Sequence, residues 1–251
     1  MARELGEQAA TAEGIFAATP PLDAIKMLIS MAASSPGRGT RNDMKVGFYD
    51  AKRAYFNAHC PEPTYVEHPH EQWRPGHCGR LRQCMYGTRA AAREWERFYG
   101  KVLVEAGFRQ GRSSPRASFH EGRRLRVVVH GDDFTALGTD SGLDWFQKVL
   151  SDAFEVEARG RLGTSPQDQQ EVRILNRLTR VTPRGYEWEP DPRHAELIIQ
   201  HMGLSGATST TTPGDKDKKV KHDEGDEEAL VGDVATAYRA LAARANVAIH
   251  G

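Results

Sequence analysis

Two adjacent carboxylates lie in the middle of the run VVVHGDDFTALG, residues 127–138, where one apolar stretch stops and another begins. Asp132 and Asp133 repel each other, and burying either one is costly unless a cation neutralises it. Mg²⁺ suits such a site, because it is usually held by one or two carboxylates together with water and phosphate oxygens. Asp50 closes a second apolar run, VGFYD, and we expect it on a neighbouring strand. Carboxylates that hold two metal ions can activate a hydroxyl and stabilise leaving pyrophosphate, so the pattern predicts nucleotidyl transfer.

Segments with clear periodicity surround these carboxylates. The apolar runs on either side of Gly131 predict a two-stranded hairpin whose turn is HGDD. Taken alone, Gly-Asp-Asp is more typical of a solvent-exposed turn. Residues 85–108 carry the strongest helical pattern, which stops at Gly107 and has an apolar stripe formed by Trp95, Phe98, Tyr99, Val102, Leu103 and Ala106.

Further helices and a second hairpin complete the expected order. Asp191 is expected to cap a helix that starts at Pro192, and Asp140 or Ser141 to cap the helix that follows the first hairpin. The order of elements predicts an α+β fold in which an antiparallel sheet has helices packed on one face. The helices are expected at residues 19–37, 141–154, 191–204 and 234–248, and the second hairpin, with two extended runs broken by TPRG, at residues 171–191.

Charge is unevenly distributed, although 34 Lys and Arg balance 34 Asp and Glu over the whole chain. From Arg74 to Arg126, 13 basic residues, almost all arginine, stand against four acids. Such a stretch suits contacts with phosphate. The alternative is a solvated helix face whose charges are balanced by acids from elsewhere in the fold.

Two other kinds of site have weaker signals. Cysteines 60, 78 and 84 form an odd set without a repeating spacing, which argues against a disulfide framework and fits a reducing compartment. Together with histidines 59, 68, 70 and 77 they lack the ligand spacing of a zinc site. Asp140-Ser141-Gly142 matches the loop of retroelement aspartic proteases, but the apolar stripe that begins at Leu143 favours a helix start.

No stretch of the chain has the roughly 20 consecutive apolar residues of a membrane span. The N-terminal sequence MARELGEQAATAEGIF lacks the basic and then apolar layout of a signal peptide. We therefore expect an intracellular protein, in the nucleus or in a cytoplasmic particle, without a membrane partner.

The motifs, taken in order, resemble the reverse transcriptase domain of copia-type LTR retrotransposons. DAKRAYFNA at residues 50–58 is similar to the family's first block, an aspartate followed by AF and LNG. MYGTRAAAREWE at residues 85–96 is similar to LYGLKQAPRAWY, and HGDD at residues 130–133 to the YVDD hairpin. Downstream segments resemble the family's FLGIEI strand, thumb helix, VSTP joint and YRSLVGSLLYLA segment, so the resemblance covers residues 20–248. It implies an RNA-directed DNA polymerase, and the ordered set of blocks is more specific than any one of them.

The resemblance assigns the metal site. Asp50, Asp132 and Asp133 would be the catalytic carboxylates. They would hold two Mg²⁺ ions, or Mn²⁺ in their place, with the Ala51 carbonyl as an additional ligand.

The resemblance also assigns substrate contacts. Tyr55 would close off the sugar 2′ position and so select deoxynucleoside triphosphates, and the alternative is an aromatic residue of the core. Gly87 and Arg89 would line the nucleotide pocket, where an arginine binds phosphate through its planar fork. An RNA template and a DNA primer are the implied partners, in contact with Arg82, Arg93 and Arg97.

Departures from the family pattern suggest a partial enzyme. His130-Gly131 stands for Tyr-Val, Ala92 stands for Pro, and most of the fingers region and the ribonuclease H carboxylates have no counterpart. We expect a piece of a longer polyprotein with weak polymerase activity, and the alternative is an inactive nucleic-acid-binding remnant. The expected segments are a disordered extension at 1–19, a palm with partial fingers at 20–190, a thumb-like helix at 191–212, a charged linker at 213–233 and the start of a connection at 234–251.

Overall fold

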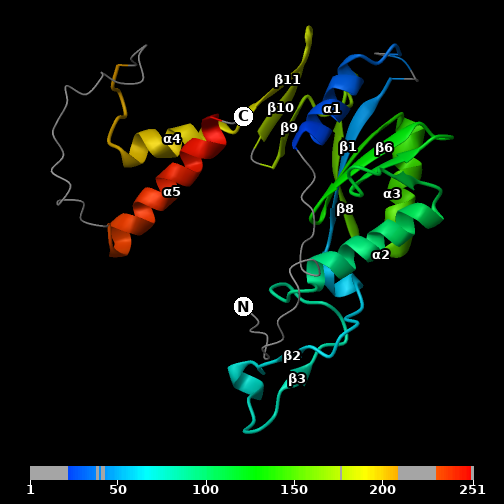
Figure 1. The fold of residues 1–251 in the computed structure, drawn as a ribbon. Helices are drawn as coiled ribbons and strands as arrows, with labels where there is room; N and C mark the ends of the chain where they lie inside the picture. Colours follow the sequence, from blue (N-terminus) through cyan, green and yellow to red (C-terminus); the bar gives the residue numbers. More distant parts are fainter. Residues whose placement is uncertain (1–21, 38–39, 41–42, 176, 209–229, 250–251) are drawn as a thin grey trace. The chain divides into compact units, whose positions relative to one another are not determined.

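The computed structural model of this chain describes residues 22–37, 40, 43–175, 177–208 and 230–249. The expected extension at 1–19 and most of the expected linker at 213–233 lie outside these residues. In chain order (Figure 1) the helices and strands are α1 (Leu22–Ala33), β1 (Lys45–Ala51), the 3₁₀ helix η2 (Ala54–Asn57), β2 (Tyr65–Val66), the 3₁₀ helix η3 (His70–Gln72), β3 (Gly79–Arg80), α2 (Ala91–Glu105), β4 (Arg109–Gln110), β5 (Ala117–His120), β6 (Leu125–His130), β7 (Asp133–Gly138), α3 (Asp140–Ala153), β8 (Val156–Leu162), β9 (Glu171–Ile174), β10 (Arg177–Thr182), β11 (Gly185–Pro190), α4 (Pro192–His201) and α5 (Gly232–Ile249).

The chain divides into two compact units. The first comprises Met1–Gln170 and Val181–Tyr186, and the second comprises Glu171–Arg180 and Glu187–Gly251. Every residue proposed from the sequence for chemistry lies in the first unit. Among the described helices, none combines the length and the apolar character needed to cross a bilayer.

A six-stranded sheet organises the first unit. Its strand order is β4-β5-β6-β7-β1-β8, and each neighbouring pair is antiparallel. Within it the sequence β1, α2, β6, β7, α3, β8 forms a β-α-β-β-α-β unit of ferredoxin-like topology, with spatial order β6-β7-β1-β8. The predicted α+β class with an antiparallel sheet is confirmed.

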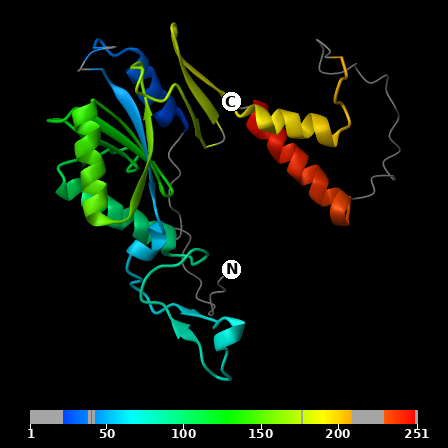
Figure 2. The ribbon, with the colours of Figure 1, turned by 180° about the vertical axis from the view of Figure 1, so that it is seen from behind.

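Helices cover both faces of this sheet. Tyr49, Val129 and Phe134 belong to one apolar cluster with residues of α2 and α3. Because side chains alternate along a strand, Phe48 and Val128 face the other side, and α1 packs there against β1, β6 and β7. Figures 1 and 2, seen from opposite directions, both show the sheet between α1 and α3. The helices were expected on a single face; α2 and α3 share one face and α1 takes the other.

The core beneath α2 and α3 is aromatic. Trp95 is 1% exposed and meets Phe154 with ring centroids 5.2 Å apart. Tyr99 meets Phe134 at 5.5 Å. Trp95, Tyr99 and Leu103 are fully buried, as expected for the helical stripe. This packing fixes α2 against the strands that carry the aspartates.

Two local expectations need correction. Thr139, not Asp140 or Ser141, caps α3: its extended backbone lets Oγ1 accept from Gly142 N at 3.4 Å. The segment expected to hold two extended runs contains three strands, because Ile174 pairs with Arg177 and closes a tight extra turn. Leu175 in this turn has a φ of 48°, a conformation that leucine rarely adopts and that sequence patterns do not signal.

In the second unit, Asp191 begins α4 as expected. Its carboxylate accepts from Arg193 N at 3.1 Å, and Pro192 occupies the first helical position. The Asp191 side chain is inaccessible to solvent and also receives Arg193 Nε at 2.8 Å. Chiefly the bond from Arg193 lowers the pKa of Asp191 to about 2. The helix then packs against α5.

The depressed pKa of Asp191 predicts acid sensitivity. Because its folded pKa lies below the unfolded value of about 3.9, its contribution to stability is complete above about pH 5 and is lost as the pH falls through 2. Asp191→Asn keeps an acceptor for the cap and should flatten this part of the stability profile. Asp191→Ala should also lose about 1 kcal/mol from the cap at pH 7. Urea unfolding followed by circular dichroism from pH 2 to 7 measures both effects; identical profiles for wild type and Asp191→Asn would contradict the assignment.

Candidate functional site

The end of β1 and the start of β7 bring two of the expected carboxylates side by side. Asp50 pairs with Asp133 in the antiparallel register, so both side chains leave the sheet on the same face. The same cross-strand row continues to His130 on β6 and to Glu157 on β8. Asp50 is buried, at 8% exposed, and Asp133 is half-buried. Three carboxylates and an imidazole therefore cross the sheet on the face opposite α2 and α3.

Asp132 lies in the turn between β6 and β7, and contacts from both sides hold that turn. Gly131 has a φ of 65°, which glycine adopts without steric cost. Ala51 N donates to the Asp132 carbonyl at 2.9 Å. Trp95 Nε1 donates to the Gly131 carbonyl at 2.8 Å. The core of α2 and the end of β1 thus fix the backbone of this turn.

Two cations already neutralise the Asp50–Asp133 pair. Arg159 Nη2 lies 2.7 Å from Asp50 Oδ1, and Arg159 Nη1 lies 3.2 Å from Asp133 Oδ1. Lys52 Nζ lies 3.1 Å from Asp50 Oδ2 and also pairs with Glu157. Both oxygens of Asp50 therefore have a positive partner.

The surroundings perturb several ionisable groups here. Burial raises the pKa of Asp133, Arg159 opposes this increase, and the charges of Asp132 and Asp50 add to it. Burial, followed by the charge of Asp132, raises the pKa of the Tyr86 phenol. The charge of Asp132 thus acts on both groups.

An aromatic pair borders the carboxylates. Tyr55 in η2 meets Tyr86 with ring centroids 4.4 Å apart, and Phe56 meets Tyr86 at 6.0 Å. Tyr55 is half-buried and packs against the aromatic core. Tyr86 is 42% exposed. The two rings form a partly accessible apolar ledge that a sugar or base could contact.

The residues expected to contact phosphate lie close to the start of α2. Gly87, with a φ of 90°, and Arg89 are exposed in the preceding loop, as is Arg82. Arg93 Nε lies 2.9 Å from Glu94 Oε1, and Arg97 Nη1 lies 3.1 Å from the same oxygen. The acidic residues of the arginine-rich stretch thus form ion pairs with basic residues of the same stretch. Because the basic residues are far more numerous, the stretch keeps a large positive excess.

The fit to a metal is partial. Asp50 and Asp133 offer neighbouring carboxylates of the kind that Mg²⁺ prefers. Over the described part of the chain, no three His, Cys, Asp or Glu side chains are arranged as a ready ligand set. The Ala51 carbonyl belongs to a buried residue. The register brings Asp50 and Asp133 together, Asp132 precedes Asp133 in the turn, and the expected convergence of all three around metal stays a prediction.

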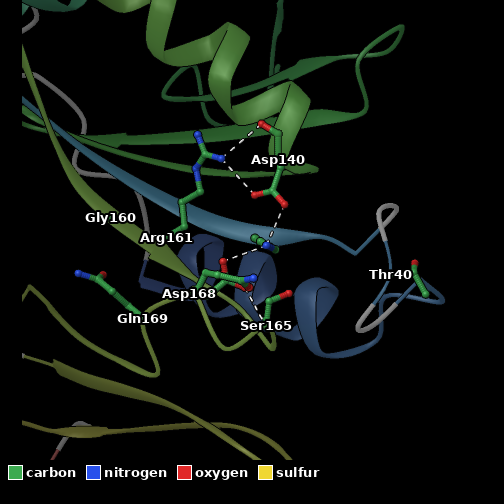
Figure 3. A pocket seen from close by; sticks show the side chains of 9 residues that line it. Thr40, Asp140, Gly160, Arg161, Ser165, Asp168 and Gln169 are labelled. Atoms are coloured by element: carbon green, nitrogen blue, oxygen red, sulfur yellow. Dashed lines mark hydrogen bonds and ion pairs between the residues drawn. The ribbon is translucent and has the colours of Figure 1, made fainter.

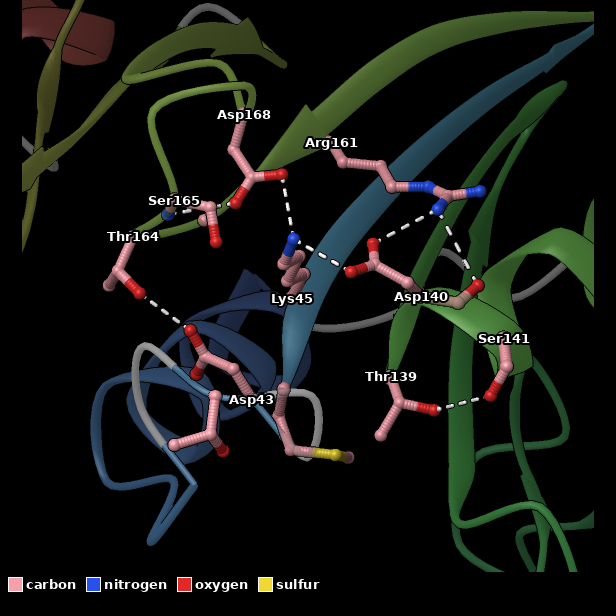
Figure 4. A network of polar contacts seen from close by, with 12 residues as sticks. Asp43, Lys45, Thr139, Asp140, Ser141, Arg161, Thr164, Ser165 and Asp168 are labelled. Carbon is pink, nitrogen blue, oxygen red and sulfur yellow. Dashed lines mark hydrogen bonds and ion pairs between the residues drawn. The ribbon is translucent and has the colours of Figure 1, made fainter.

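The cysteines and the Asp-Ser-Gly sequence lie elsewhere. Cys60 and Cys84 are buried, Cys78 is exposed, and all three are free thiols. Asp140 starts α3, where Arg161 Nη1 lies 3.1 Å from its Oδ1 (Figure 4). This carboxylate therefore belongs to a charged network.

A second polar site opens beside the start of β1, about 17 Å along the strand from Asp50. Its cavity has a volume of about 790 Å³, and its lining includes Lys45, Asp140, Ser165 and Asp168 (Figure 3). Lys45 Nζ lies 2.8 Å from Asp140 Oδ2 and 2.9 Å from Asp168 Oδ1 (Figure 4). Asp168 in turn accepts from Ser165 N at 3.0 Å. The paired charges fasten the loop after β8 to the sheet.

The Lys45 network predicts a strong coupling in stability. Lys45→Met should lower the free energy of unfolding by about 3 kcal/mol, because it leaves the Asp168 carboxylate buried without a counter-ion. Adding Asp168→Asn should recover most of this loss, since the amide keeps an oxygen for Ser165 N and carries no charge. Urea unfolding of the two variants tests this, and equal losses would show that the pair is not coupled.

Four residues have roles around the site that were not anticipated from the sequence. Arg159 and Lys52 were not expected as partners of Asp50, Trp95 was expected only as a core residue, and Tyr86 only as part of a helix start. Lys52 had a local signal, because it follows Asp50 by two residues, the spacing at which side chains along a strand share one side. Arg159 lies 109 residues from Asp50, so only the strand register could reveal it.

No protein-family model matches the chain, and no curated protein matches it.

Proposed function

We propose that this chain is a palm-type nucleotidyltransferase domain, a fragment of an RNA-directed DNA polymerase of the copia type. The observation that carries the proposal is the placement of Asp50 directly opposite Asp133 on neighbouring strands and on one face. Adjacent acidic side chains repel each other unless cations neutralise them, and such pairs are frequent at functional sites.

The topology around this pair supports the proposal. The pair sits on the two central strands of the β-α-β-β-α-β unit, and the turn with Asp132 projects from the same end. This fold hosts many activities, so the fold alone does not assign a function. The assignment depends on the aspartates and on the ordered motifs around them.

Each part of the site has a role in this proposal. Asp50 and Asp133 would hold Mg²⁺, with Asp132 beside them. Bound Mg²⁺ would lower the pKa of a primer hydroxyl and neutralise charge on the leaving pyrophosphate. Tyr55 and Tyr86 offer a ledge for the sugar of an incoming deoxynucleotide, and the exposed arginines before α2 meet phosphates of the RNA template and DNA primer.

A nucleic-acid-binding remnant is the second candidate. The observation that favours it is the occupation of both Asp50 oxygens by Arg159 and Lys52. A pair neutralised by protein cations can persist for stability alone, without metal chemistry. The arginine-rich stretch would then retain phosphate binding without turnover.

Primer extension separates the two candidates. The assay supplies the chain with a primed RNA, deoxynucleoside triphosphates and Mg²⁺, and resolves products at single-nucleotide length. Extension that depends on Mg²⁺ supports the polymerase proposal. Tight binding of the primed RNA without any extension supports the remnant and contradicts the polymerase.

Salt dependence tests the proposed nucleic-acid surface. Arg82→Ala with Arg89→Ala should reduce the slope of log affinity against log salt by about 1.5, because each phosphate contact contributes about 0.7 to 0.9. The matched control is Lys101→Ala with Arg109→Ala, which removes two charges from the same stretch that are paired with Glu105 and Glu121. Equal slopes for both double variants would show that the two sets of cations contribute alike and would contradict a defined surface.

A further inference from the structure

Arg159 occupies an irregular position on β8. Phe48 pairs with Gly160 and Tyr49 pairs with Ala158, so Arg159 is an extra residue between two successive pairs. Gly160 beside it has a φ of 117°, a conformation that favours glycine. Such a bulge breaks the alternation of the strand and redirects the side chain of the inserted residue. The local backbone therefore aims Arg159 at the carboxylates.

The guanidinium group spans two strands. Its Nη2 and Nη1 atoms reach Asp50 Oδ1 and Asp133 Oδ1 at 2.7 and 3.2 Å. The rigid fork of donors on arginine suits such a double contact, which a lysine ammonium reproduces only as a point charge. The side chain of Arg159 remains 49% exposed, whereas that of Asp50 is 12% exposed. Arg159 can therefore turn into solvent while the aspartates stay in place.

The same carboxylate oxygens are those that a divalent cation would need. We propose that Arg159 is a resident counter-ion that competes with divalent metal for the Asp50–Asp133 pair, so that release of its guanidinium accompanies metal binding. This inference rests on the proposed function, since it takes the pair to be a metal site. Lys52 holds the second oxygen of Asp50 and cannot replace Arg159, because Arg159 is the only cation among the described residues that pairs with both aspartates.

Competition of this kind lowers the affinity of the aspartate pair for metal by a measurable factor. A charge-assisted contact on a half-exposed arginine is weaker than one in the interior, so its loss should raise metal affinity by about tenfold. Arg159→Gln removes the charge and keeps a side chain of similar reach. Arg159→Lys keeps the charge without the fork and should give an intermediate affinity.

The experiment is a titration of the full chain with Mn²⁺, in which electron paramagnetic resonance reports the free ion. Arg159→Gln should bind Mn²⁺ about tenfold more tightly than wild type. Arg161→Gln is the matched control, because it removes an arginine from the same strand that pairs with Asp140 and Asp144 instead. Its affinity for Mn²⁺ should equal that of wild type. Thermal unfolding by circular dichroism verifies that each variant is folded.

The outcomes separate this inference from the proposed function. Asp50→Asn introduced into Arg159→Gln should abolish the tighter binding. If Asp50→Asn removes Mn²⁺ binding from wild type but Arg159→Gln binds no more tightly, the competition is wrong and the metal site stands. If Mn²⁺ binding is absent or independent of Asp50 in every variant, the metal site is wrong and the inference falls with it.

Discussion

Replacing Asp50 with Asn should lower primer extension by at least about 10³-fold, since a lost metal ligand removes several kcal/mol of transition-state stabilisation. The amide has nearly the shape of the carboxylate but lacks its charge. Asp50 lies opposite Asp133 and is the more buried of the two. Its replacement should therefore disable the pair while affinity for the primed RNA stays nearly unchanged. Single-turnover extension and a binding titration under the same conditions measure the two quantities.

Glu157→Gln is the matched control for Asp50→Asn. Glu157 lies next to Asp50 in the cross-strand row and shares Lys52 as a partner, but it is not expected to hold metal. Its replacement should change extension by less than about threefold, as for a solvated surface ion pair. Equal losses in both variants would indicate a general electrostatic effect of the row. Extension at the wild-type rate by Asp50→Asn would refute the polymerase assignment.

Trp95→Ala should cost about 3 to 5 kcal/mol of folding free energy, as is typical when a large aromatic is removed from a packed core. Trp95 meets four aromatic rings, those of Phe98, Tyr99, Phe134 and Phe154. This loss is large compared with the free energy of unfolding of a typical domain, which is about 5 to 15 kcal/mol. Urea unfolding followed by circular dichroism gives the value.

Trp95→Phe separates the packing from the hydrogen bond. It preserves an aromatic ring but removes the donor to the Gly131 carbonyl, and should cost about 1 to 3 kcal/mol. Amide hydrogen exchange should then accelerate at the turn with Asp132 more than in β8. Trp73→Phe is the control, because Trp73 is 61% exposed and its change should be within about 0.5 kcal/mol. Unchanged exchange at the turn in Trp95→Phe would show that the indole does not hold it.

Much of the fold was predictable because its signals are local. The stripe from Trp95 to Leu103 repeats with the helical period, and the apolar runs around Gly131 form the expected hairpin. The capping of α4 by Asp191 followed from residue types alone. Leu175 shows the limit, because a leucine at positive φ gives no turn signal and an extra strand reversal was missed.

The site was less predictable because it depends on register. That Asp50 and Asp133 are neighbours could be expected from the ends of two apolar runs. The separate placement of Asp133 on the strand and Asp132 in the turn could not, because the two residues are chemically identical in sequence. The contact between Arg159 and Asp50 depends on a bulge that lies 109 residues from Asp50 in the chain. A shift of the strand register by one residue would send the Arg159 side chain to the other face of the sheet.

The bulge on β8 also bears on how the chain behaves at high concentration. β8 is the outer strand of the six-stranded sheet, and an outer strand can pair with the strand of another molecule and start aggregation. The inserted residue interrupts the regular spacing of backbone groups, and Glu157, Arg159 and Arg161 place charges along the strand. The other edge strand of the sheet, β4, has two residues, which is too short for a strand of another molecule to pair with. The irregularity that aims Arg159 at the aspartates thus also protects the sheet against intermolecular strand addition.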